Sequence, residues 1–139
     1  KRIDHVALAP SVSGEVEARL SSLFGLFMGS KERVADQKVD ATFLHPSADP
    51  SATAIELVAP VGNDSLQRFV DKRGTALHHI CFEVEDLAAA LATLKAEGIP
   101  LVDEVPRRGA RGHWVGFIHP KATGGVLFEL CQPAEGESS

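Results

Sequence analysis

The sequence is poor in cysteine: Cys81 and Cys131 are the only two among 139 residues. Two cysteines are too few for the disulfide frameworks that stabilise small secreted domains, and this scarcity favours a reducing compartment. We therefore expect a cytoplasmic protein. The proposed elements place both cysteines within strands, on the face that carries the polar residues discussed below. We expect buried, inert thiols, although their oxidation would disturb that face.

Long hydrophobic runs and an excess of basic residues are also absent. No apolar stretch reaches the length that crosses a bilayer, and no signal-peptide pattern occurs at the start of the sequence. The 14 Lys and Arg residues are outnumbered by 19 Asp and Glu, which gives a net charge of −5. This balance disfavours nucleic acid as the main partner. We expect a globular protein that binds neither membranes nor nucleic acids.

The sequence does contain an internal repeat. Three pairs of segments match at a nearly constant offset: DHVALAP with HHICFEV, TFLHP with GFIHP, and AIELVAP with LFELCQP. His5 and His79 are 74 residues apart in the first match, and Glu56 and Glu129 are 73 apart in the last. Three matches in the same order across most of the chain indicate two copies of one structural unit.

Each copy predicts the same order of elements. Apolar periodicity predicts strands, in the first copy, at residues 3–9, 28–34, 39–45 and 53–59, with a helix at residues 13–24 capped by Ser13. The second copy predicts strands at residues 77–84, 101–105, 113–119 and 126–131, with a helix after Asp86. The predicted fold is α+β, with two tandem βαβββ modules whose sheets curl together around a cleft. We expect one domain, residues 1–139, with module one at 1–62, a connector helix at 63–74, module two at 75–133 and a tail at 134–139.

Two adjacent histidines, His78 and His79, open the predicted strand of the second copy. Side chains alternate along a strand, so the two imidazoles point to opposite faces. His78 shares a face with Ile80 and Phe82, which we expect to pack towards the helices. His79 faces the other way, and the repeat makes it the partner of His5.

The glutamates of the last match are unusual because each interrupts an otherwise apolar strand. A carboxylate in the middle of such a strand is costly to bury unless a cation, a hydrogen-bond network or solvent compensates it. Two imidazoles and two carboxylates at matching repeat positions predict a site for one divalent transition metal, formed by His5, Glu56, His79 and Glu129. Taken singly, each histidine is typical of a strand end and each glutamate of an exposed sheet face; the constant offset favours the shared site.

The same residues resemble a known family. The segments DHVALA, IELVAPVGNDSLQRFVDKRGTALHHICFEVEDLAAAL and HPKATGGVLFELCQP are similar to the vicinal oxygen chelate superfamily and, within it, to the methylmalonyl-CoA epimerases. The resemblance covers the second copy and the ends of the first, and is weaker around residues 24–36. It implies a divalent metal, either cobalt, zinc, nickel or manganese, held by the four residues already named. It also implies a coenzyme A thioester substrate and a homodimer.

The implied reaction inverts the C2 centre of methylmalonyl-CoA through an enolate, with the metal assisting removal of the C2 proton. Inversion requires two acid/base groups, one on each face of the carbon. Glu129 is our candidate for one, in addition to its role as a ligand. The second is open: the position where some family members carry a glutamate is Ala41 here, Asp40 should face the wrong way without a bulge, and Glu56 or a metal-bound water could substitute.

Other residues allow two interpretations. Arg107, Arg108 and Arg111, with Lys121, could contact the phosphates of coenzyme A or form a lid with hinges at glycines; they could equally belong to a solvated hairpin loop. His45 and His119 precede prolines at strand ends, and we interpret them as structural or as supporting the site.

Two alternative functions remain at this point. A glyoxalase I-type lactoylglutathione lyase, or another metal-dependent enzyme of the superfamily, would use a similar metal and a similar intermediate. A metal-free binding protein of the same fold, of the kind that sequesters antibiotics, would need none of the four polar residues; their presence together disfavours it.

Overall fold

The computed structural model describes residues 2–134. The chain forms two compact units, which we call the N-terminal unit (residues 5–78) and the C-terminal unit (residues 2–4 and 79–134). The first strand begins in the C-terminal unit with Ile3 and Asp4 and continues in the N-terminal unit. None of the helices within residues 2–134 combines the length and the hydrophobicity needed to span a bilayer.

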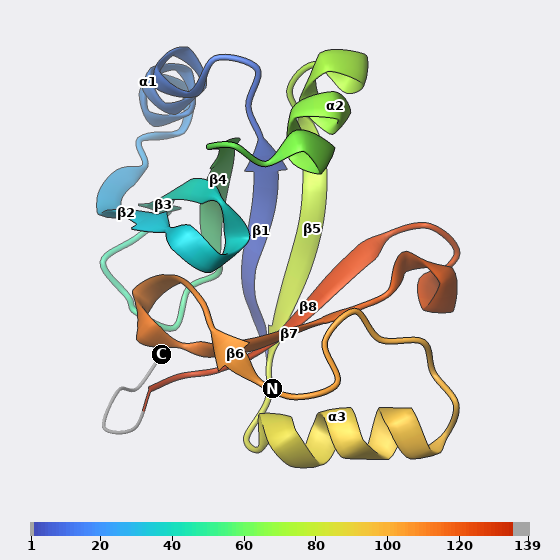
Figure 1. Ribbon diagram of the computed structural model, residues 1–139. Helices are drawn as coiled ribbons and strands as arrows, with labels where there is room; N and C mark the ends of the chain where they lie inside the picture. Colours follow the sequence, from blue (N-terminus) through green and yellow to red (C-terminus); the bar gives the residue numbers. More distant parts are fainter. Residues whose placement is uncertain (1, 135–139) are drawn as a thin grey trace. The chain divides into compact units, whose positions relative to one another are not determined.

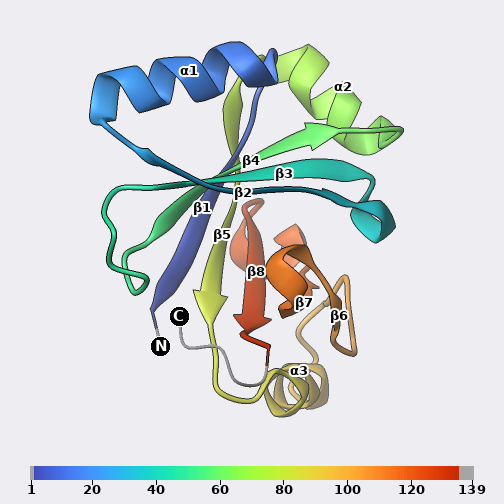
Figure 2. The same cartoon turned by 90° about the vertical axis from the view of Figure 1, so that its left-hand side faces the viewer.

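Four strands form the sheet of the N-terminal unit, in the order β2-β3-β4-β1. They are β1 (Ile3–Ala9), β2 (Phe27–Val34), β3 (Val39–His45) and β4 (Ala54–Pro60). The pairs β2/β3 and β3/β4 are antiparallel, whereas β1 and β4 are parallel. Figure 2 shows helices α1 (Ser13–Phe24) and α2 (Asp64–Arg73) on the same side of β2, β3 and β4. A short 3-10 turn, Ala35–Gln37, joins β2 to β3.

The C-terminal unit repeats this arrangement with the order β5-β8-β7-β6. Its strands are β5 (Ala76–Glu83), β6 (Arg107–Arg108), β7 (Trp114–Ile118) and β8 (Leu127–Gln132). The pair β5/β8 is parallel, and β6/β7 and β7/β8 are antiparallel. Helix α3 (Leu87–Ala96) follows β5 and packs against β7 and β8 (Figure 1). The predicted α+β class and the two βαβββ modules are therefore confirmed.

Side-chain chemistry explains where the helices begin. Asn63 accepts a hydrogen bond from the Leu66 amide at the start of α2, and Asp86 does the same for the Ala89 amide at the start of α3. Helix α1 differs from the prediction, since Val12 occupies the N-cap position without a side-chain hydrogen bond and Ser13 is the first helical residue.

The packing of α3 depends on a glycine in the strand beneath it. A Cβ atom added to Gly116 of β7 would approach Leu91 Cδ1 of α3 to 2.9 Å. Leu87 and Leu91 are fully buried on this face of α3. A larger residue at position 116 would therefore displace the Leu91 side chain from this position. The N-terminal unit is built around Phe43, Leu44 and Leu57, which are also fully buried.

The predicted strand at residues 101–105 is wrong. Leu101 forms only an isolated bridge with Ile118, and the edge strand β6 is confined to Arg107–Arg108. The reason is a side chain: Asp103 accepts a hydrogen bond from the Phe117 amide (2.9 Å) and so occupies a donor that a strand would use. The prolines that flank this segment, Pro100 and Pro106, also have no amide to donate to a sheet.

Candidate metal and acid/base site

In the N-terminal unit, His5 of β1 and Glu56 of β4 form a buried pair. The distance from His5 Nε2 to Glu56 Oε1 is 3.1 Å, and the side chains are only 5% and 8% exposed. The parallel register brings them together: Glu56 lies opposite Ala7, two residues beyond His5, so both side chains point to the same face.

In the C-terminal unit, His79 of β5 and Glu129 of β8 form the equivalent pair. The distance from His79 Nε2 to Glu129 Oε1 is again 3.1 Å, and the side chains are 4% and 6% exposed. Glu129 lies opposite Cys81, which is two residues beyond His79. The register, the distance and the burial therefore all repeat those of the first pair.

Each imidazole is also fixed by an aromatic ring from the neighbouring antiparallel strand. Phe43 of β3 meets the His5 ring edge to face, with the ring centroids 5.5 Å apart at 88°. Phe117 of β7 meets the His79 ring in the same way, at 5.2 Å and 84°. Such contacts restrict the rotation of the imidazole and leave its Nε2 directed towards the carboxylate. Sequence reasoning missed both phenylalanines, although they occur 74 residues apart in the TFLHP and GFIHP segments.

These pairs fit a divalent metal in chemistry and in spacing. Imidazole nitrogen and carboxylate oxygen both coordinate borderline transition metals. Two such ligands, each about 2.1 Å from a metal and at right angles to one another, lie about 3.0 Å apart. The 3.1 Å separation of Nε2 and Oε1 in each unit matches that geometry. Each unit therefore offers one histidine and one glutamate already placed as neighbouring ligands.

A third buried carboxylate, Asp4, has a different environment within the C-terminal unit. Its side chain is fully buried and forms ion pairs with Arg2 (3.1 Å) and Arg111 (2.5 Å). Arg2 also contacts Glu83 at 3.3 Å. Two guanidinium groups therefore neutralise Asp4, which ties the start of β1 to the loop before β7. Sequence reasoning did not identify this cluster.

Neither Ala41 nor Asp40, the two β3 positions considered for the second acid/base group, is suited to that role. Ala41 is a buried hydrophobic residue. Asp40 lies opposite Arg33 in the β2/β3 ladder and forms an ion pair with it. The hydrogen bond from the Arg33 guanidinium holds the pKa of the Asp40 carboxyl below its usual value. This exposed pair makes Asp40 a weak base.

The arginines considered for phosphate binding are engaged within the C-terminal unit. Arg107 forms an ion pair with Asp103 (3.1 Å), and Arg108 stacks over the Trp114 ring at 3.9 Å. Arg111 is bound to Asp4 and has a left-handed backbone conformation, with φ of 59°. The loop is therefore held by internal contacts rather than being an open, solvated hairpin.

The two cysteines lie next to the His79–Glu129 pair. Cys81 and Cys131 are free, and they are 0% and 1% exposed. Burial raises the pKa of the Cys81 thiol well above its usual value, with smaller contributions from Cys131 and nearby carboxylates. A hydrogen bond with Cys81, aided by one from His113, lowers the pKa of Cys131 to about 7 against the opposing effect of burial.

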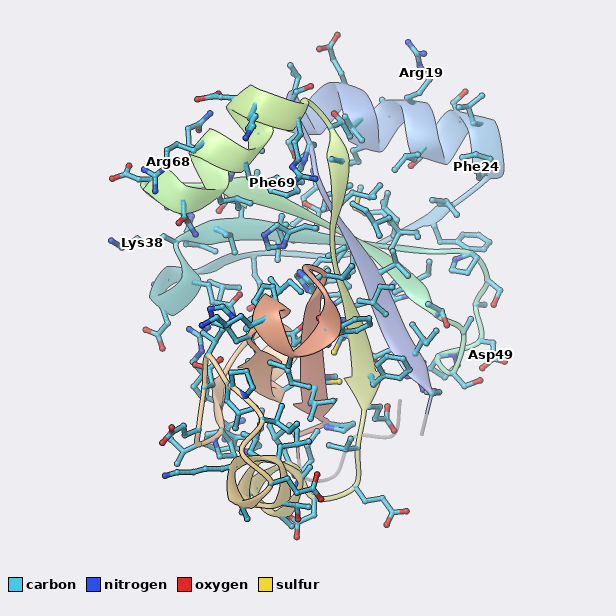
Figure 3. The ribbon with its side chains drawn as sticks, turned by 90° about the vertical axis from the view of Figure 1, so that its right-hand side faces the viewer. Arg19, Phe24, Lys38, Asp49, Arg68 and Phe69 are labelled. Carbon is cyan, nitrogen blue, oxygen red and sulfur yellow. The ribbon has the colours of Figure 1, made fainter. Side chains whose placement is uncertain are left out.

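The remaining histidines have structural contacts. His78 meets the ring of Phe69 edge to face at 5.2 Å, which confirms that it faces the helices. Figure 3 shows Phe69 on α2. His119 accepts a hydrogen bond from the Lys121 amide and caps the 3-10 turn Pro120–Thr123. His45 packs over Gly29, leaving no room there for a Cβ atom.

Comparison with known proteins agrees with this geometry. Residues 4–117 match the model of the Glyoxalase/Bleomycin resistance protein/Dioxygenase superfamily. The chain is 36% identical over 134 residues to an ethylmalonyl-CoA/methylmalonyl-CoA epimerase of Cereibacter sphaeroides, covering 94% of this chain and 97% of that protein.

Solved structures give the same result. A Streptomyces coelicolor methylmalonyl-CoA epimerase variant in complex with 2-nitronate-propionyl-CoA is 30% identical, with a TM-score of 0.90 over 100% of this chain and 99% of that one. A methylmalonyl-CoA epimerase in complex with methylmalonyl-CoA and NH4+ is also 30% identical, with a TM-score of 0.89 over 99% and 98%. The chain therefore belongs to the glyoxalase/bleomycin resistance protein/dioxygenase superfamily and, within it, to the family of the methylmalonyl-CoA epimerases.

Proposed function

We propose that this protein is a methylmalonyl-CoA epimerase, which interconverts the 2R and 2S epimers of methylmalonyl-CoA. The observation that carries the proposal is similarity along nearly the whole chain to proteins of that name, including 36% identity over 134 residues. The two buried histidine–glutamate pairs support it, because they supply metal ligands and a carboxylate base.

We assign His5, Glu56, His79 and Glu129 as ligands of one divalent metal ion. Each unit would contribute one imidazole and one carboxylate to the ion. Bound there, the cation would supply Lewis-acid stabilisation of the negative charge that develops when the C2 proton leaves. Cobalt, zinc, nickel and manganese all accept this mixture of nitrogen and oxygen ligands.

Glu129 is proposed as one acid/base group: it takes the C2 proton from one epimer, and in the reverse direction it delivers a proton to the same face of C2. Glu129 is buried, at 4% exposure, so few water molecules surround the carboxylate that would accept the proton. His79 holds the carboxylate of Glu129 at 3.1 Å, so that its orientation is set before substrate binds. The second acid/base group is not assigned, since Ala41 has no acid/base function and Asp40 is committed to Arg33.

The substrate proposed is a coenzyme A thioester, and the oligomer proposed is a homodimer. Exposed apolar side chains at the junction of α1 and β2 support association: Leu23, Phe24, Phe27 and Met28 are 64%, 67%, 58% and 49% exposed. Figure 3 shows Phe24 at the end of α1. Analytical ultracentrifugation tests this point, because a monomer at micromolar concentration would contradict it. The cytoplasmic location expected from the sequence stays a prediction.

Two assays with the metal-loaded protein test the activity. Incubated in deuterated water with a single epimer of methylmalonyl-CoA, it should form the other epimer and incorporate deuterium at C2, as observed by NMR. It should not convert the hemithioacetal of methylglyoxal and glutathione. Turnover of the hemithioacetal with no deuterium uptake at C2 would establish the lyase instead.

A further inference from the structure

The edge strand β2 of the N-terminal unit carries a glutamate, Glu32, that has no role so far. The proposed reaction needs a second acid/base group, because inversion at C2 removes a proton from one face and returns one to the other. Ala41 and Asp40 of β3 do not serve, since Ala41 is apolar and Asp40 is paired with Arg33. Glu32 lies in the strand next to them, and a role for it in this reaction rests on the proposed epimerase function.

The β2/β3 ladder determines the face of the sheet on which Glu32 lies. Glu32 is directly opposite Ala41, and opposite residues of antiparallel strands project from the same face with Cβ atoms about 5 Å apart. Ala41 shares this face with Phe43, which is two residues further along β3 and contacts the His5 ring. Phe43 in turn lies opposite Glu56. Glu32 therefore projects from the face that carries the His5–Glu56 pair, which we call the inner face.

The neighbours of Glu32 along β2 support this orientation. Lys31 forms an ion pair with Glu17 of α1 (2.9 Å), so its side chain points to the side of the sheet on which α1 lies. Arg33 follows Lys31 by two positions and shares that side. Both cations are more than half exposed, whereas Glu32 is partly buried and Val34, two residues beyond it, is buried. Alternation along the strand thus leaves Glu32 and Val34 on the inner face.

The C-terminal unit shows how far a side chain at the equivalent position extends. Val115 of β7 matches Ala41 at the repeat offset of 74 residues. Arg107 of the edge strand β6 lies opposite Val115, so it occupies the position of Glu32 in this unit. Its guanidinium carbon is 5.8 Å from the centroid of the Phe117 ring, and that ring contacts the histidine of this unit. A side chain at this position therefore extends across the sheet towards a histidine–glutamate pair.

The surroundings of Glu32 on the inner face suit a carboxylate that exchanges a proton with a carbon atom. Ala41 lies opposite Glu32, Val58 lies opposite Ala41 in β4, and Val34 is on the same face of β2. All three are buried and apolar. The methyl side chain of Ala41 leaves space beside Glu32, and the apolar surface matches the methyl substituent on C2 of the substrate. Glu32 is thus a partly buried acid/base group next to an apolar surface.

We propose that Glu32 is the second acid/base group and acts on the face of C2 opposite to the one served by Glu129. In one direction, the ionised carboxylate of Glu129 forms an O–H bond as the C2–H bond breaks, and the electron pair moves to the thioester oxygen. Glu32 starts protonated and gives its proton to the other face of C2 as the electron pair returns to carbon. In the reverse direction the two groups exchange roles, so protons and charge balance in each turnover.

Exchange in deuterated water tests the assignment, with the metal-loaded full chain and each epimer supplied separately. Glu32→Gln should slow epimerisation by about 100-fold to 10,000-fold, because general acid–base catalysis contributes rate factors of that size. The epimer whose proton Glu129 removes should still take up deuterium without inversion, whereas the other epimer should not exchange. Epimerisation at the wild-type rate, or an equal loss of exchange for both epimers, would overturn the assignment.

Three further measurements separate a catalytic role of Glu32 from a structural one. The matched control Glu17→Gln changes a glutamate on the other side of the sheet and should leave epimerisation unchanged. Adding Ala41→Glu to Glu32→Gln returns a carboxylate to the inner face and should restore epimerisation; no recovery in a double variant that is folded by circular dichroism would overturn the assignment. Cobalt affinity of Glu32→Gln, measured by titration calorimetry, should equal that of the wild type, and a clear loss would overturn the assignment in favour of a role in metal binding.

The wild type tests the proposed function separately from the role of Glu32. If the wild type exchanges the C2 proton of neither epimer, the epimerase proposal fails, and the assignment of Glu32 fails with it. If the wild type epimerises the substrate and Glu32→Gln does so equally fast, only the assignment of Glu32 fails.

Discussion

The two units of this chain place the same side chains in nearly the same geometry. His5 and Glu56 in the N-terminal unit and His79 and Glu129 in the C-terminal unit are each 3.1 Å apart and buried. In each case the glutamate lies opposite the residue two positions beyond the histidine. A shared register is the cause, because it fixes both the face and the diagonal distance of the pair. Position along the strands, rather than the surrounding sequence, therefore determines the site.

Elsewhere the units differ, both at the edge strand and beside the pairs. The edge strand β2 has eight residues, whereas its counterpart β6 has two. The residue that follows the histidine by two positions is Ala7 in one unit and Cys81 in the other. The duplicated fold thus tolerates changes at its edges and beside the pairs, while the strand positions that carry the histidines and glutamates remain alike.

Substitution of the two glutamates should give the largest difference between the units, measured as the rate of C2 proton exchange. Glu129→Gln removes the proposed base and should slow exchange of the C2 proton by about 100-fold to 10,000-fold, because general base catalysis contributes rate factors of that size. The matched change Glu56→Gln removes a ligand charge and should slow exchange less. Deuterium uptake measured by NMR at saturating cobalt compares them. A larger loss for Glu56→Gln would reverse the assignment of the base.

Substitution of the two histidines should instead lower the cobalt affinity by similar factors. Loss of a residue that merely supports a ligand weakens metal binding 10-fold to 100-fold, so His79→Ala should cost at least about 100-fold in cobalt affinity, and His5→Ala should match it within a few-fold. Titration calorimetry gives both values, and circular dichroism checks that each variant is folded. If His5→Ala bound cobalt as tightly as the wild type, the N-terminal pair would not be part of the site.

The buried ion pairs of Asp4 provide a third comparison, in which the measured quantity is the free energy of unfolding. Asp4→Asn leaves the partly buried guanidinium of Arg111 without its carboxylate and Arg2 with Glu83 alone, and this should lower the free energy of unfolding by about 3 kcal/mol. Urea denaturation of the metal-free chain measures the change. Arg111→Met is the matched control: it removes one cation but leaves Asp4 paired with Arg2, so it should cost less than Asp4→Asn.

The smallest effect is expected for the exposed pair of the N-terminal unit, Arg33 and Asp40. Asp40→Asn should leave the urea midpoint at neutral pH unchanged within error, because exposed ion pairs contribute little. The pKa of Asp40 is lowered in the folded state, so its small contribution exists above the unfolded pKa and disappears as the pH falls. A clear midpoint shift at neutral pH would show that this pair matters more than its exposure implies.

The internal repeat made most of the fold predictable. The offset between matching segments defined two modules, and alternation within the strands placed His5, His79, Glu56 and Glu129 on the correct faces. Helix α1 was predicted with the bounds that the structure shows, Ser13–Phe24, because its apolar periodicity is clear. The boundaries proposed at residues 62, 74 and 133 stay a prediction.

The predictions were wrong or incomplete where side chains make the hydrogen bonds that organise the chain. The segment around residues 101–105 has the composition of a strand, but Asp103 binds the Phe117 amide and no periodic pattern reveals that interaction. Likewise, the ion pair between Asp4 and Arg111 joins residues 107 positions apart, and no local sequence pattern predicts it. Phe43 and Phe117 were within the matched segments, so the repeat could have identified them as ring partners of the histidines.

The central claim is that both histidine–glutamate pairs bind the same cation, and X-ray absorption of the cobalt-loaded chain tests it most directly. With elemental analysis to count the metal, the account predicts one cobalt ion per chain, with two imidazoles among its neighbours. Two cobalt ions per chain, each with a single imidazole, would show that the pairs bind metals separately and would contradict the account.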